Sequence, residues 1–141
     1  MNDFYEVKTV DLVGAALDWA VANAVGLPLC EEACQGDFIL IGHGDGDLER
    51  FAPSTDWSQC GPLRDKYKVC VFDAGPQEAY GNKEMVAATL DTGFSWIDTS
   101  FKEAGGVGET APIAICRAVV RHESGDVVRV PAELIGNANP L

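Results

Sequence analysis

Positive charge is what this chain has least of. Ten Lys and Arg residues stand against 22 Asp and Glu residues, and the formal net charge is −12. A field of this sign repels phosphate backbones, so we expect no direct binding to DNA or RNA. The acidic residues are scattered along the chain and do not form dense rows, which argues against mimicry of nucleic acid.

Long apolar runs are also missing, since no stretch approaches the ~20 residues that a membrane-spanning helix needs. The first residues, Met1–Glu6, lack the basic start and the apolar core of a secretory signal. We therefore expect a cytoplasmic protein that does not contact a membrane.

The chain lacks the spacing of ligands that is typical of a metal site. Its five cysteines are irregularly spaced, and Cys30 and Cys34 are separated by three residues, which is not the spacing of a zinc knuckle. Cysteines in a chain without a signal are expected to be reduced and to pack as small hydrophobic residues. We predict no metal site and no cofactor.

Histidine, the usual general base, occurs only at positions 43 and 122. Ser54 lacks the Gly-x-Ser-x-Gly context of a hydrolase nucleophile, and no spacing selects a catalytic pair of carboxylates. We assign no catalytic residue and expect a protein that is not an enzyme, with a small hydrolase-type enzyme as an alternative.

The residues that are present predict a single domain over 1–141 with a frayed tail at 136–141. The hydrophobic fraction of 47% is enough for a core. Alanine-rich residues 12–25, capped by Thr9 or Asp11, and residues 113–123, capped by Thr110, predict two long helices. We expect an α+β fold in which these helices pack on a small, mainly antiparallel sheet. The expected strands are 1–9, 37–42, 48–52, 69–72, 85–90, 94–97 and 127–135, with a short helix over 62–68 and loops at 73–82 and 103–109.

Residues 51–63 combine two prolines with large aromatic and polar side chains, so we interpret them as an ordered connection. Hydroxyls, a carboxylate, an indole and a cation together suit a small polar ligand. The predicted ligand-binding residues are Ser54, Thr55, Asp56, Trp57 and Arg117. In the competing structural interpretation, Ser54 or Asp56 caps a turn and Trp57 fills the core. Arg117 then pairs with Asp56.

Four blocks of sequence carry a resemblance that spans nearly the whole chain. They are Lys8–Ala20, Pro53–Trp57 with Gly61–Leu63, Gly108–Val120, and Gly125–Leu134. In these blocks the chain resembles the NinX-like family of small phage and prophage proteins, a domain of unknown function. The resemblance implies a phage accessory protein made in the cytoplasm of the bacterial host cell, and it implies no reaction.

Together these observations favour a non-enzymatic phage accessory protein that binds a small polar ligand resembling a nucleotide or metabolite. The alternative partner is a bacterial host protein, recognised by an acidic interaction module. Helix faces rich in Trp and Ala would also allow a homodimer.

Overall fold

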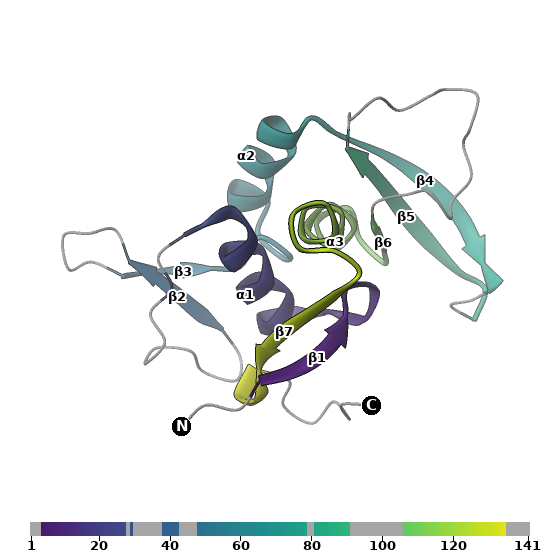
Figure 1. Cartoon of the computed structure of the whole chain (residues 1–141). Coiled ribbons are helices and arrows are strands. Elements are labelled where there is room, and N and C mark those ends of the chain that lie inside the picture. The colour runs from purple at the N-terminus through teal and green to yellow at the C-terminus, as the bar shows by residue number, and fades with distance from the viewer. Residues whose placement is uncertain are drawn as a thin grey trace.

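The computed structural model describes residues 4–27, 29, 38–42, 48–78, 81–90 and 106–134. In these described residues, three helices pack together and three small antiparallel sheets surround them (Figure 1). This arrangement confirms the predicted α+β class. Within the described residues, no helix combines the length and the apolar character needed to cross a bilayer. The helices are α1 (Gly14–Val25), α2 (Trp57–Tyr67) and α3 (Ala111–Ser124).

Each sheet is an antiparallel unit of two or three strands. The first pairs β1 with β7, so it joins the two ends of the described chain, and the second is the β2–β3 hairpin. The third has the order β4-β5-β6. The strands are β1 (Phe4–Lys8), β2 (Ile39–Gly42), β3 (Leu48–Phe51), β4 (Val69–Gln77), β5 (Lys83–Leu90), β6 (Gly106–Gly108) and β7 (Val127–Pro131).

Helix α3 lies at the centre of the molecule (Figure 1). The Thr110 hydroxyl accepts a bond from the Ile113 amide at 3.4 Å, and Pro112 occupies the first turn, as predicted. Every residue from Ala114 to Val120 is buried, because α1, α2 and the β4-β5-β6 sheet all pack against this helix. The helix ends at Gly125, which confirms the predicted stop.

The predicted start of α1 was wrong, because neither Thr9 nor Asp11 caps it. Thr9 belongs to a short 3-10 helix (Thr9–Asp11), and α1 begins two residues after Leu12 with no side-chain cap. The Thr9 hydroxyl donates to the Gly125 carbonyl at 2.6 Å, and its amide donates to the Asp126 carbonyl at 2.8 Å. Thr9 therefore ties the end of β1 to the start of β7.

The second half of the predicted 51–63 connection is helical. Helix α2 begins at Trp57 and contains Pro62, whereas we expected Pro62 to start the helix. The reason is the cap at Asp56, whose carboxylate accepts the Ser58 amide at 2.9 Å and satisfies a first-turn donor. Pro62 then removes one backbone hydrogen bond inside α2.

Strand β4 extends through residues 73–77, where we predicted a loop, and the register shifts between Asp73 and Gly75. This irregularity lets the strand bend and continue through Gly75 and Pro76. The predicted partner of β5 at 94–97 lies outside the described residues. In the part of the chain that the structure describes, β5 pairs with β4 and β6.

Strand β6 lies within the predicted loop 103–109 and packs closely on α3 (Figure 1). A Cβ added at Gly106 would overlap the Ala114 carbonyl oxygen and lie 2.5 Å from the Ala118 amide nitrogen. At Gly108 it would lie 2.6 Å from the Ile113 side chain. The two glycines are therefore required by the close approach of strand and helix.

Candidate functional site

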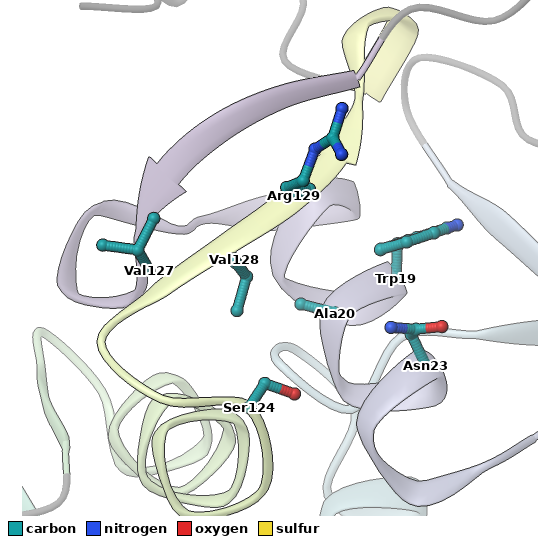
Figure 2. Close-up of a pocket in the computed structure, with 7 residues that line it drawn as sticks. All are labelled: Trp19, Ala20, Asn23, Ser124, Val127, Val128 and Arg129. Carbon is teal, nitrogen blue, oxygen red and sulfur yellow. The ribbon is translucent and has the colours of Figure 1, made fainter.

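A groove with a volume of about 240 Å³ lies between α1 and β7, and we call it the α1–β7 groove. Figure 2 shows Trp19, Ala20 and Asn23 on α1 facing Val128 of β7, with the Ser124 hydroxyl at the end of α3 pointing into the space between them. The groove is lined by Trp19, Ala20, Asn23, Ser124, Val127, Val128 and Arg129.

The α1 side of the groove comes from one face of the helix. Trp19 and Asn23 are four residues apart, so their side chains are neighbours on the helix surface. Trp19 is 9% exposed, and its ring packs against Phe4 of β1 with centroids 6.0 Å apart and planes at 58°. This contact holds the indole in place, and the exposed amide of Asn23 adds a donor and an acceptor beside it.

The β7 side offers backbone groups. The Thr9 amide donates to the Asp126 carbonyl, which continues the β1–β7 register by one position. In an antiparallel ladder, hydrogen-bonded residue pairs alternate with pairs that are not hydrogen-bonded. Because Thr9 and Asp126 form a hydrogen-bonded pair, Val127 and Arg129 make no backbone hydrogen bonds to their partners on β1. Their amides and carbonyls consequently point away from β1, toward the edge of β7 on which the groove lies.

Arg129 supplies the positive charge of the groove. Its cross-strand partner is Glu6, on the same face of the ribbon, and both side chains are exposed. A guanidinium presents several donors in a plane and suits a carboxylate or a phosphate. The groove lining thus combines one cation, neutral polar groups, an indole and the apolar side chains of Ala20 and Val128, and Val128 points to the opposite face of the ribbon from Arg129 (Figure 2).

The predicted ligand-binding residues occupy different environments. Ser54 is buried, and its amide donates to the Asp18 carboxylate of α1 at 2.9 Å. Burial raises the pKa of Asp18 from 3.8 to about 6, while the Ser54 amide and hydroxyl and the positive charge of Arg50 oppose this rise. The Ser54 hydroxyl lies near enough to influence this carboxylate but has no hydrogen bond of good geometry among the described residues.

The neighbouring residues Thr55, Asp56 and Trp57 are exposed. The Asp56 carboxylate accepts the amide of Ser58 at 2.9 Å and its hydroxyl at 2.7 Å, and these bonds lower the pKa of Asp56. Trp57 is 54% exposed and does not fill the core. Asp56 is thus a helix cap, as one interpretation expected, and the indole of Trp57 is available on the surface.

Arg117 is buried in α3, at 6% exposure. Its Nε donates to the Leu12 carbonyl at 3.0 Å, and a terminal nitrogen donates to the Val107 carbonyl at 2.6 Å. These bonds connect α3 to the start of α1 and to β6. The predicted pairing of Arg117 with Asp56 is not among the ion pairs found between described residues.

The structure therefore brings Ser54, Thr55, Asp56 and Trp57 together only as neighbours in sequence, with Arg117 bonded elsewhere. Whether they contact a ligand stays a prediction. The groove residues Ser124 and Arg129 carried no signal in the sequence. The spacing of Trp19 and Asn23 placed both on one helix face, but only the position of β7 makes that face part of a groove.

Comparison with known proteins bears on the identity of the chain. Among curated proteins, no sequence matches it. The family described as Bacteriophage P22, NinX matches residues 8–122, which is most of the chain. This span runs from the end of β1 into the last turn of α3, so it includes α1, α2 and most of α3. The chain belongs to the bacteriophage P22 NinX family and is a phage accessory protein.

Proposed function

We propose that this phage protein is a non-catalytic binding protein and that its ligand is a small polar metabolite held in the α1–β7 groove. The observation that carries the proposal is the composition of the groove, in which Arg129, Asn23, Ser124 and the Trp19 indole line one open space. Ligand sites typically combine an apolar surface with a few polar groups that fix orientation.

The size of the groove restricts the ligand. Pockets for drug-sized molecules measure roughly 300–1,000 Å³, and this groove is smaller at about 240 Å³. A compact molecule with one planar ring and one acidic group fits best. Its acidic group would bind the guanidinium of Arg129, and its ring would contact the accessible part of Trp19.

The charge of the protein limits the ligand further. With a net charge of −12, the protein repels molecules that carry several negative charges. A single carboxylate on an otherwise neutral or cationic molecule meets both requirements. Nucleobase-like acids and aromatic amino acids are examples of this class.

A thermal-shift screen tests the proposal directly. The panel contains nucleobases, nucleoside monophosphates, aromatic amino acids and aromatic carboxylic acids. A ligand at a hundred times its Kd stabilises the folded state by about 2.7 kcal/mol, which gives a clear rise in melting temperature. A panel without any such rise would count against the groove as a metabolite site.

Variants identify the site. Arg129→Ala should weaken binding ~10- to 100-fold, because a charge-assisted hydrogen bond contributes about 1.5–3 kcal/mol. Arg64→Ala is the matched control, since Arg64 is an exposed arginine on α2 outside the groove lining. Equal affinity in the wild type and the Arg129 variant, measured by calorimetry, would place the ligand elsewhere.

A bacterial host protein is the second candidate partner, and the exposed indole of Trp57 at the start of α2 favours it. Exposed tryptophans are frequent anchors of protein interfaces. In this case Trp57→Ala would abolish capture of one specific host protein while Arg129→Ala would not. Loss in both variants, or in neither, would contradict this assignment.

A further inference from the structure

Strand β1 forms the outer edge of the β1–β7 ribbon. Figure 2 shows β7 between β1 and α1, and among the described strands β1 pairs only with β7. The residues of β1 are exposed except for the half-buried Val7. An edge strand in this position is a template on which another strand can pair. We propose that β1 pairs antiparallel with β1 of a second copy of this chain, so that two ribbons join into one sheet with the strand order β7-β1-β1-β7.

The backbone of β1 offers hydrogen-bonding groups along this edge. Because Thr9 and Asp126 form a hydrogen-bonded pair, Phe4, Glu6 and Lys8 make no backbone hydrogen bonds to their partners on β7. Their amides and carbonyls therefore point away from β7, toward the open edge. A second strand can donate to and accept from these groups without disturbing the ribbon.

The charges on β1 select one register for this pairing. In a dimer with two-fold symmetry, every contact between the copies occurs twice. A register with Glu6 opposite Glu6, or Lys8 opposite Lys8, places like charges together and is destabilised, and one with Phe4 opposite Glu6 leaves Lys8 without a partner on β1. With Val7 on the two-fold axis, Glu6 of each copy faces Lys8 of the other. Glu6 then lies between Arg129 of its own chain and Lys8 of the second copy.

The same register brings apolar side chains together at both ends of the pairing. Phe4 of one copy comes opposite Val10 of the other, in the 3-10 turn that follows β1. Phe4 is 39% exposed and Val10 is 42% exposed, so both have apolar surface that this contact covers. The paired segment is short, which indicates a dimer that dissociates on dilution.

Exchange of the charges tests the register, with sedimentation equilibrium as the measurement. At about 0.15 M salt, the general repulsion between two chains of net charge −12 is screened over ~8 Å. Glu6→Lys and Lys8→Glu each place like charges opposite each other, so each variant alone should dimerise at least about 10-fold more weakly than the wild type. Glu6→Lys makes the chain less negative, so general repulsion predicts the opposite result for this variant.

Two combinations should restore the dimer. An equal mixture of the Glu6→Lys and Lys8→Glu chains should form a mixed dimer, because opposite charges then face each other at both positions. The double variant Glu6→Lys/Lys8→Glu should recover most of the wild-type dimerisation for the same reason. Circular dichroism checks that each variant keeps its fold.

A change in the backbone tests the strand pairing itself. Lys8 has a φ of −66°, which proline adopts, and its amide points away from β7. Lys8→Pro therefore removes an amide that the second copy needs and leaves the bonded pairs of β1 with β7 in place. Lys8→Ala is the matched control, because it removes the same charge and keeps the amide. We expect no dimer for Lys8→Pro and a weakened dimer for Lys8→Ala, with both chains folded.

Three outcomes would overturn the proposal. A wild-type chain that stays monomeric up to about 1 mM has no such interface. A dimer that is as strong in Lys8→Pro as in Lys8→Ala uses another surface. A mixture of the two charge variants that associates no better than either variant alone refutes the register.

Discussion

Asp18 offers the most direct test of the interior, because a buried carboxylate lowers stability at neutral pH. Burial raises the pKa of Asp18 from 3.8 to about 6, so the folded state binds its proton more tightly than the unfolded state does. The stability that comes from this protonated form is fully present below about pH 4 and is lost as the pH rises through about 6. One pH unit corresponds to about 1.4 kcal/mol, so the full cost above this range is about 3 kcal/mol.

Asp18→Asn removes the charge and keeps a carbonyl oxygen that accepts the Ser54 amide. We expect the variant to be more stable than the wild type by up to about 3 kcal/mol near pH 8, with the difference falling toward zero near pH 4. The groups around the carboxylate are Ser54, Arg50, Cys60 and Cys116.

Urea unfolding followed by tryptophan fluorescence measures this difference at several pH values. Asp65→Asn is the control, because it removes one negative charge at an exposed position on α2. Each variant has one negative charge fewer than the wild type, whose net charge is −12, so the general effect of charge on stability cancels when the two variants are compared with each other. A stability difference that is the same at every pH, or a variant that is less stable throughout, would refute the reasoning.

Substitutions at three other positions test the contacts that hold the fold. Gly106→Ala should lower stability by about 1–3 kcal/mol in urea titrations, because its Cβ would overlap the α3 backbone, and unchanged stability would contradict this close approach. Arg117→Ala leaves the Leu12 and Val107 carbonyls without the arginine donor, so it should lower the free energy of unfolding by about 3 kcal/mol or more. Thermal unfolding measures this loss, and a variant as stable as the wild type would contradict a structural role for Arg117. Asp56→Ala removes the α2 cap and should lower the melting temperature, whereas Asp56→Asn should retain most of it, as circular dichroism would show.

Local signals in the sequence were sufficient to locate most elements. Thr110, Pro112 and Gly125 bound α3 because a side-chain cap, a fixed φ and a flexible stop act within one turn of the chain. Gly26, in the left-handed conformation, ends α1 for the same local reason. The strands at 39–42 and 48–51 pair as the expected hairpin.

Local signals were misleading where two of them competed. Pro62 suggested a helix start, but the Asp56 cap begins α2 earlier and the helix tolerates the proline within it. Gly106 and Gly108 suggested a loop, but they belong to β6, which pairs with β5. Glycine stands at both positions because β6 lies so close to α3 that a side chain would not fit. The sequence does not show which of two signals prevails, since packing against α3 decides it.

The sequence by itself determined the α+β class, the family and the net charge of −12. The tertiary structure alone decided which polar residues meet. Asp18 and Ser54 are 36 positions apart, and Arg117 and Leu12 are 105 positions apart. Such pairs depend on how the helices and β-strands pack together, and no local pattern records that packing. For the same reason no local pattern predicts the α1–β7 groove. It forms because β7, which pairs with β1, lies next to α1 in the folded protein.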